Sequence, residues 1–444
     1  MELSRRGLIV TGAAAAATAA LVPGRLLAVV EAATPPPAKL DDWTQVRKQF
    51  ALSPEWLHFS GFFIASHPQP VREAIEGFRR AIDENPFLVV HEGLFESESK
   101  NLLGRTMAEA ATYLGGKPDE VAITRSTTEG LTLVYHGLPL KAGDEVLTTR
   151  HDHRAHHEAI RLAALRSGAS TRRIALFDDS ATATAGGIVE RLRSAIRPAT
   201  RVIGVTWVHS QSGIRLPVRQ IAAAVAEVNR TRDPKEHVLL VVDGVHGLGC
   251  VDETVATMGA DYFCAGTHKW IFGPRGTGIV WARAERWAAL RELVPSFSDP
   301  EMFRAWAEER APATPNNARR MTPGGFQAFE HQWALAAAFR FSSSLGRARV
   351  AARVRDLNTR IKKGLAAIPG VRQHTPMDPG LSAGICCFDL DRRKPEEVVQ
   401  ALLARKVIAS TSPYAVPCAR LSAGIFNTPE EVDRAVEAVR GALA

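Results

Sequence analysis

The residue types best suited to covalent chemistry stand just past the middle of the chain. Residues 261–270 read Asp-Tyr-Phe-Cys-Ala-Gly-Thr-His-Lys-Trp, and a glycine-rich turn follows at residues 273–278. An apolar run thus ends in a turn of small residues that presents Lys269. A lysine held against a packed core loses its proton more easily than a solvated one, because desolvation disfavours the ammonium form. Lys269 is therefore predicted to form a Schiff base with a carbonyl group.

An acid ends a second buried-strand pattern upstream of this lysine. Residues 238–243 read Val-Leu-Leu-Val-Val-Asp, which places Asp243 at the end of the predicted strand. Pyridoxal phosphate (PLP), which binds lysine as a Schiff base, requires an acid at its ring nitrogen. Taken singly, a strand-end aspartate is more often a helix cap, and a lysine can simply extend from an apolar edge into water. Together, Asp243 and Lys269 favour a PLP enzyme.

The segment between residues 119 and 283 alternates short apolar runs with helical stretches. Such alternation is typical of an α/β fold with a mainly parallel sheet between two layers of helices, and ligands then bind beyond the carboxyl ends of the strands. Seven strands are expected, at residues 121–124, 145–149, 171–174, 202–207, 238–242, 262–265 and 278–281. Helices are expected near residues 128–138, 153–167, 187–195 and 217–228.

Four segments are expected along the chain. The first two are a signal segment, residues 1–33, and an N-terminal segment, residues 34–68. Residues 69–320 are expected to form a large cofactor-binding domain. Residues 321–444 are expected to begin with long helical sequence rich in Ala, Arg and Leu and to end in a smaller α/β domain.

The start of the chain has the pattern of an export signal. Arg5 and Arg6 precede an uncharged, alanine-rich run at residues 11–22, which is too short and too weakly apolar for a comfortable membrane span. The paired arginines fit a twin-arginine signal. Small residues suited to cleavage are Ala28, Ala32 and Ala33. We expect export to the periplasm through the twin-arginine translocase and no stable membrane anchor; a chance Arg-Arg pair is the alternative.

Composition argues against two kinds of function. The net charge of +8 is spread over many arginines, with no basic block interleaved with aromatic residues, so nucleic-acid binding is not expected. Five cysteines form no CxxC motif and stand in apolar or small-residue surroundings. They are predicted to be buried thiols rather than a disulfide framework or a metal site.

Three motifs resemble one enzyme family when taken together. They are the Thr-His-Lys turn at 267–269, the Asp-Gly-x-His strand end at 243–246, and the string Arg-Leu-Ser-x-Gly-Ile-Phe-Asn-Thr-Pro-Glu-Glu-Val-Asp at 420–433. Their order and spacing resemble the fold-type I PLP enzymes of the class V aminotransferase superfamily, from about residue 55 to 440. That superfamily includes isopenicillin N epimerase-like enzymes and cysteine desulfurases. The resemblance implies a large PLP-binding domain with a seven-stranded sheet, a smaller C-terminal domain and a homodimer.

The resemblance also assigns roles to individual residues. Lys269 would carry the cofactor as a Schiff base and then move the proton at the substrate Cα. Asp243 would keep the ring nitrogen protonated. His246 would contact the cofactor's phenolic oxygen, or would be only a packed polar residue. Arg420 would pair with the substrate α-carboxylate as a planar bidentate donor, although a surface arginine on an edge strand is the alternative.

A phosphate site is expected where residues 125–131 follow a strand and open a helix. Free N–H groups at a helix N-terminus bind phosphate well, although a simple capping sequence explains the same residues. The family has its phosphate loop at this position. The expected phosphate contacts are Ser126, Thr127, Thr128, Thr267, His268 and, from a neighbouring subunit, Thr322.

Four histidines and an aspartate crowd residues 151–157, which read His-Asp-His-Arg-Ala-His-His. Such a cluster could ligate a metal ion, and a metal-dependent hydrolase built on it is one alternative function. No HExxH motif supports that alternative. The family has an aromatic residue or histidine here that stacks on the cofactor ring, and His153 aligns best with it. We favour ring stacking by His153 and expect no metal.

These groups serve chemistry at an amino-bearing carbon without choosing among transamination, epimerisation, decarboxylation and elimination. A cysteine desulfurase needs a nucleophilic cysteine on the loop before the carboxylate-binding strand. Residues 410–415 contain none, and Cys418 stands too close to Arg420, within the expected strand. Sulfur mobilisation is therefore not expected.

Export suggests what kind of substrate the enzyme would take. Central metabolism keeps its transaminases in the cytoplasm, so an exported member of the family is expected to tailor a secreted metabolite. With the export signal, residues 58–68 are similar to periplasmic enzymes that modify the glutamyl side chain of pyoverdine siderophores. A peptidic siderophore precursor with a carboxylate is then the expected substrate. An epimerase, a transaminase, or a non-catalytic protein that keeps the fold are alternatives, although Asp243 and Lys269 argue against the last.

Overall fold

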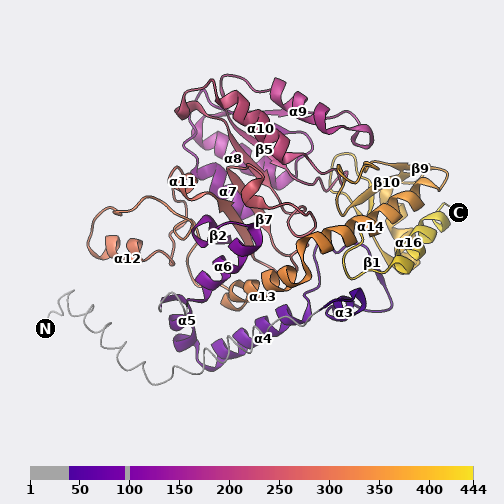
Figure 1. Cartoon of the computed structure of the whole chain (residues 1–444), viewed down its shortest axis with the longest axis horizontal. Helices are drawn as coiled ribbons and strands as arrows, with labels where there is room; N and C mark the ends of the chain where they lie inside the picture. The colour runs from indigo at the N-terminus through magenta and orange to yellow at the C-terminus, as the bar shows by residue number, and fades with distance from the viewer. Residues whose placement is uncertain (1–39, 96–100, 444) are drawn as a thin grey trace.

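A seven-stranded sheet forms the centre of the larger domain. In the computed structural model, which describes residues 40–95 and 101–443, its strand order is β2-β8-β7-β6-β5-β3-β4 (Figure 1). β8 is antiparallel to both neighbours and the other six strands are mutually parallel. Each strand overlaps one of the seven predicted: β2 Val121–Thr124, β3 Glu145–Thr149, β4 Ser170–Ile174, β5 Thr200–Thr206, β6 Leu239–Asp243, β7 Tyr262–Gly266 and β8 Gly278–Ala282. The prediction of a mainly parallel sheet is confirmed.

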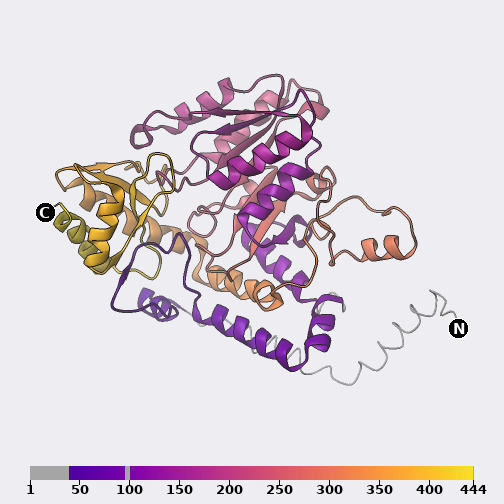
Figure 2. The same cartoon turned by 180° about the vertical axis from the view of Figure 1, so that it is seen from behind.

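Helices cover both faces of this sheet because its strands are apolar on both sides. Successive side chains of a strand point to opposite faces. Tyr262 and Cys264 pack with α7 and α8, whereas Phe263 and Ala265 belong to the core formed with α6, α9, α10 and α13. The two layers are visible in Figure 2. The helices are α6 Leu102–Leu114, α7 Thr127–Gly137, α8 Arg154–Ser167, α9 Ala185–Ser194, α10 Val218–Asn229 and α13 Phe329–Leu345.

A smaller domain is built on the four-stranded antiparallel sheet β12-β13-β10-β9. The N-terminal segment joins it, because β1 pairs in parallel with β11 and Leu57 and Phe59 pack into its core. Its elements are β1 Leu57–His58, α14 Arg347–Ala366, β9 Val371–Gln373, β10 Cys386–Leu390, α15 Pro395–Ala404, β11 Val407–Ile408, β12 Ser410–Thr411, β13 Ala419–Leu421 and α16 Pro429–Gly441.

The change from one core to the other lies inside α14. Val350 and Val354 belong to the large-domain core, and Leu357 and Ile361 to the small-domain core. Helix α13 also packs on the large domain, against α4 and α6. The small-domain core thus begins within α14, after the long helical sequence expected from residue 321.

The remaining elements surround this frame. Helix α4 runs along α13, and α12 stands in a long loop away from the body of the molecule (Figure 1). Within residues 40–95 and 101–443, no helix is long and apolar enough to cross a membrane. The predicted signal segment, residues 1–33, lies outside the described residues. The elements are α3 Trp43–Lys48, α4 Gln69–Glu84, α5 Pro86–Phe95, α11 Ala284–Trp287 and α12 Pro300–Ala307.

Candidate active site

A cavity of about 410 Å³ opens at the carboxyl ends of the parallel strands. Thr206 at the end of β5 and Asp243 at the end of β6 line it, and Lys269 enters from the turn after β7. This is where ligands collect in sheets of this type. Nine of the eleven predicted site residues line the cavity: Ser126, Thr127, Thr128, His153, Asp243, His246, His268, Lys269 and Arg420.

Lys269 and His246 form a pair inside this cavity. The Lys269 Nζ lies 2.9 Å from Nε2 of His246. Burial lowers the pKa of Lys269 to about 8; the Asp243 carboxylate opposes that change and the Arg420 charge adds to it. Burial also holds the pKa of His246 well below its usual value. The pair therefore combines a readily deprotonated amine with a neutral imidazole.

Asp243 is held at the cavity floor by the turn that follows β6. Only 2% of it is exposed, it accepts from the Val245 N–H at 3.1 Å, and burial raises its pKa to about 6. The turn can descend onto β7 because residue 244 is glycine. A Cβ on Gly244 would stand 1.9 Å from Cζ of Phe263, far inside van der Waals contact. The Asp-Gly pair thus fixes where the carboxyl group lies.

The start of α7 forms the opposite end of the cavity. Ser126 caps the helix by accepting from the Glu129 N–H at 3.1 Å, and Thr127 accepts from the Gly266 N–H at 2.7 Å. The first N–H groups of a helix have no intrahelical partner, so this end suits a phosphate. Gly266 lets the turn carrying His268 approach closely, since a Cβ there would stand 2.9 Å from the His268 ring.

Arg420 is oriented from β13 by neutral acceptors. Its guanidinium donates to Ser210 O and Thr411 O, both at 2.9 Å, and to the Ser410 hydroxyl at 3.2 Å. Its Cζ lies 4.8 Å from the centre of the Phe62 ring. None of these partners is charged, so the positive charge of a 4%-exposed arginine is available to an anion in the cavity.

The histidine cluster does not converge on one point. His151 accepts from the Leu176 N–H at 3.2 Å, His156 meets the Tyr135 hydroxyl at 2.7 Å, and His157 donates to Thr149 O at 2.7 Å. Asp152 accepts from Thr148, Thr149 and Thr206. Within the described ranges, no three His, Cys, Asp or Glu side chains are grouped to hold a metal ion. The metal-cluster alternative therefore has no structural basis here.

His153 is the one member of that cluster on the cavity wall. It caps α8 through Nδ1, which accepts from the Ala155 N–H at 3.2 Å, and so its ring proton belongs on Nε2. Its ring packs edge to face against the ring of Tyr414, with the two ring centres 6.3 Å apart. Burial, with the Lys269 and Arg420 charges, lowers its pKa. A neutral ring held in this way can cover a flat ligand.

Two predicted phosphate contacts lie outside the cavity. The Thr267 hydroxyl is fully buried and faces that of Thr277 at 2.6 Å, which braces the turn before Lys269. Thr322 is also buried; it accepts from the Ile123 N–H at 3.1 Å and donates to Ala318 O at 3.0 Å. Both hydroxyls are engaged in hydrogen bonds inside the fold, so their contact with a phosphate stays a prediction.

Several residues that line the cavity or contact its lining escaped the sequence interpretation. Phe62 lies under Arg420, and Ser210 bonds the Tyr414 hydroxyl at 2.8 Å, which joins the loop after β5 to the small domain. Thr206 and Ser210 could have been found by extending the strand-end rule to β5. Phe62 and Tyr414 have no comparable signal, because their positions depend on contacts between distant segments.

The protein-family model for class V aminotransferases matches residues 65–435. The chain belongs to the class V aminotransferase family. Isopenicillin N epimerase of Streptomyces clavuligerus is 28% identical over 414 residues, covering 90% of this chain and 98% of that protein. Cysteine desulfurase of Cronobacter sakazakii is 25% identical over 396 residues, covering 84% of this chain and 89% of that protein.

Solved structures share the class V fold. A mutant of C-DES with glycine covalently linked to the PLP cofactor superposes with a TM-score of 0.78 at 20% identity, covering 89% of this chain and 98% of its own. The apo cysteine desulfurase of Thermococcus onnurineus NA1 superposes with a TM-score of 0.75 at 20% identity, covering 90% of this chain and 98% of its own. These likenesses establish the fold.

The cofactor of this class V family is PLP, and the cavity fits it. Bound PLP supplies an electron sink for charge that develops at the substrate Cα. Lys269 would hold its carbonyl carbon, Asp243 its ring nitrogen and the start of α7 its phosphate. The His246 Nδ1 is buried without a hydrogen-bond partner in the described part of the chain, so one polar atom of this cavity residue is left unsatisfied.

Proposed function

We propose that the protein uses PLP to labilise the Cα proton of an amino-acid-type substrate, as an epimerase or transaminase. The observation that carries this proposal is the convergence of Lys269, His246 and Arg420 in one cavity. Lys269 is the base at Cα, since a pKa of about 8 leaves a useful fraction of neutral amine near neutral pH. His246 accepts from or donates to its Nζ and so fixes where the amine points.

Arg420 selects a substrate that carries a carboxylate. A guanidinium held by three protein acceptors and the Phe62 ring has little freedom, so the carboxylate that it binds is fixed in turn. Fixing the carboxylate would in turn orient the bonds at the substrate Cα. The pKa values of His153 and His246 are lowered, so their rings are neutral and Arg420 is the cation that attracts such an anion.

Desulfuration is the activity that we propose the enzyme lacks, although desulfurases are among its relatives. All five cysteines are buried in the described structure, and none lines the catalytic cavity. Cys418 precedes β13 instead of lying within a strand, and its thiol donates to Gln211 O at 3.1 Å. A hydrogen bond from Cys387 lowers the pKa of Cys418 to about 7, but this thiol faces a different cavity.

Proton exchange tests this function even while the product is unidentified. The holoenzyme is incubated in D₂O with a panel of L- and D-amino acids and glutamyl peptides, and loss of the Cα proton is followed by NMR. We expect exchange with at least one substrate, and none with the Lys269→Ala variant. Racemisation without an oxo acid identifies an epimerase, whereas a requirement for an oxo acid identifies a transaminase. Sulfide release from cysteine without any exchange would overturn the proposal.

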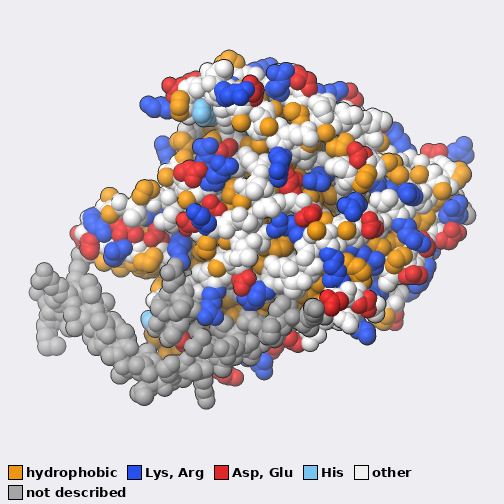
Figure 3. Space-filling model, viewed as in Figure 1, with side chains coloured by type: hydrophobic (Ala, Val, Ile, Leu, Met, Phe, Trp, Pro, Cys, Tyr) orange, Lys and Arg blue, Asp and Glu red, His pale blue; other side chains and the backbone are white. Residues whose placement is uncertain are grey.

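We also propose export and a homodimer. Arg5 and Arg6 before the alanine-rich run support export, and a peptidic siderophore precursor with a glutamyl carboxylate is then the first substrate to test. Large aromatic side chains exposed on α5 and α12 support a second copy as partner: Phe87 is 74% and Trp306 79% exposed. In Figure 3, apolar side chains also lie at the surface of the loop that carries α12. Cell fractionation tests the first proposal and light scattering the second.

A further inference from the structure

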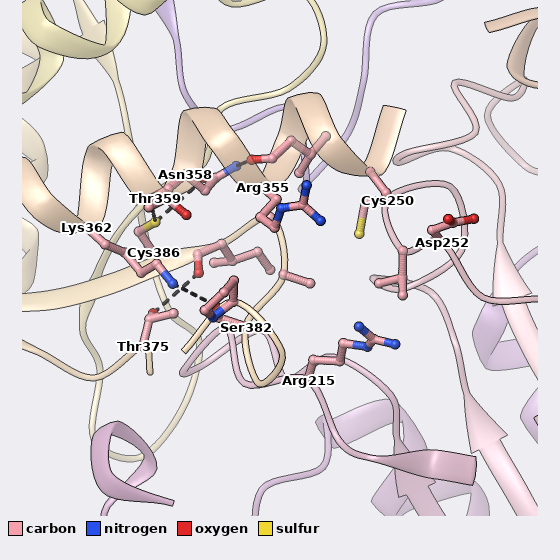
Figure 4. A pocket seen from close by; sticks show the side chains of 17 residues that line it. Arg215, Cys250, Asp252, Arg355, Asn358, Thr359, Lys362, Thr375, Ser382 and Cys386 are labelled. Atoms are coloured by element: carbon pink, nitrogen blue, oxygen red, sulfur yellow. Dashed lines mark hydrogen bonds between the residues drawn. The ribbon is translucent and has the colours of Figure 1, made fainter. Parts of the chain in front are cut away.

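A second cavity, of about 290 Å³, lies between the two domains. Its walls are the middle of α14, the turn at residues 250–252 and the segment from 375 to 386. It shares no lining residue with the catalytic cavity. Its polar lining includes Arg215, Asp252, Arg355, Asn358, Thr359 and Lys362 (Figure 4).

Two contacts show that this cavity is separate from the active site yet adjacent to it. Cys250 lines the second cavity and its thiol donates to His246 O at 2.8 Å. Gly384, on the opposite wall, leaves room for the Trp270 ring: a Cβ there would stand 2.6 Å from Cζ2 of that ring. His246 and Trp270 therefore lie between the cavity and Lys269, and form a wall rather than an opening.

Lys362 brings a buried charge to this cavity. It is 2% exposed, and its Nζ donates to the Ser382 hydroxyl at 2.6 Å and to the carbonyls of Pro376 and Met377 at 2.8 and 3.2 Å. These three neutral acceptors use all three ammonium protons. No carboxylate contacts the ammonium directly; the Asp378 charge favours it from a greater distance, but burial still lowers the pKa of Lys362. An anion in the cavity would relieve this cost.

Lys362 has no hydrogen-bond donor left for a ligand, but two arginines of the cavity can supply donors. Arg355 Nε lies 3.7 Å from Asp356, too far for a hydrogen bond, so its guanidinium fork is open to a ligand. Arg215 donates to Glu253 at 2.9 Å, a carboxylate that Arg219 also approaches at 3.5 Å. Asp252 is the one carboxylate on the cavity wall. Among the side chains that line this space, the cations Arg215, Arg355 and Lys362 outnumber the single acid.

We propose that this interdomain cavity is a second, non-catalytic binding site for a small anion that carries a carboxylate or phosphate group. Arg355 and Arg215 bind the anionic group, and Lys362 contributes its charge from behind. The volume is at the lower end of the range for small-molecule sites, so the ligand is a small metabolite rather than a nucleotide.

Calorimetric titration of inorganic phosphate and of succinate tests this site. The protein used is the holoenzyme reduced with borohydride, so that the cofactor fills the catalytic phosphate site. Ionic strength is kept constant with chloride. We expect saturable binding of at least one anion. Binding of phosphate or of succinate identifies the ligand class as phosphate or carboxylate. Arg355→Gln should weaken that binding about tenfold, the loss of one charge-assisted hydrogen bond.

Arg360→Gln is the matched control, because it removes the same charge from the same helix. Arg360 is exposed and pairs with Asp433 of α16, away from the cavity. Its substitution should leave affinity within about twofold, because its guanidinium is already paired with Asp433 and does not line the cavity. Absence of saturable binding, or equal losses in the two variants, would overturn the proposal. Binding unchanged by Arg355→Gln would overturn it as well, because the anion would then occupy another site.

Discussion

Gly244→Ala should disable cofactor binding while leaving the fold intact. Gly244 has no left-handed backbone angle, so alanine brings no conformational strain of its own. The problem is space: the added Cβ would stand 1.9 Å from Cζ of Phe263 and 2.0 Å from Cε2. Because the ring belongs to β7 and is fully buried, the turn that carries Asp243 and His246 is the part that must move.

The size of the effect follows from that overlap. Ordinary van der Waals contact begins at 3.4 Å, so a Cβ at 1.9 Å must retreat by roughly 1.5 Å. Overpacking of this kind costs about 1–3 kcal/mol. Asp243 lies next to the substitution, so most of that energy should appear as weaker PLP binding. We expect the Kd for PLP to rise about tenfold to a hundredfold.

Visible absorbance during PLP titration of the apoenzyme measures this Kd. Phe263→Leu removes the ring atoms that the added Cβ would meet, so the double variant should recover most of the lost affinity. Gly186→Ala is the control: its Cβ meets nothing within 4 Å, and affinity should not change. Wild-type affinity in Gly244→Ala, or a double variant no better than the single one, would refute this account of the turn.

Two further predictions concern the same site, and a third concerns the exposed surface of α12. The rate at which apoenzyme captures PLP should rise through about pH 8, where Lys269 loses its proton. In Asp243→Asn the pH at which this rate is half-maximal should fall, because a negative charge that favours the Lys269 ammonium is gone. Stopped-flow absorbance across a pH series measures both. Arg420→Lys should raise KM for a carboxylate substrate about tenfold or more, with a smaller change in kcat, in steady-state assays. Trp306→Glu should shift the mass in light scattering from dimer towards monomer.

The centre of the sheet could be predicted because its strands are buried on both faces. Segments such as Tyr262–Gly266 and Gly278–Ala282 are continuous apolar runs, which is what a sheet between two layers of helices requires. Once the strands were placed, Asp243 and Lys269 had to lie at the same edge. That placement does not depend on side-chain direction, which is why it was correct.

Side-chain direction could not be read from the sequence. Thr267 adjoins the key motif, yet its hydroxyl turns inward to Thr277. His151 lies in the turn after β3, His153 caps α8, and His156 and His157 lie in the first turn of α8, so their rings diverge. Phe62 reaches the cavity because β1 pairs with β11, whose register sets Leu57 opposite Val407. No local pattern encodes a pairing between segments so far apart.

Borohydride reduction followed by peptide mass spectrometry tests the central claim most directly. Reduction makes a Schiff base permanent, so the lysine that holds PLP keeps the phosphopyridoxyl group through digestion. Our account predicts that this group is found on the peptide containing Lys269, and that the Lys269→Ala variant carries none. Modification of another lysine, or no modification of a PLP-saturated protein, would contradict it.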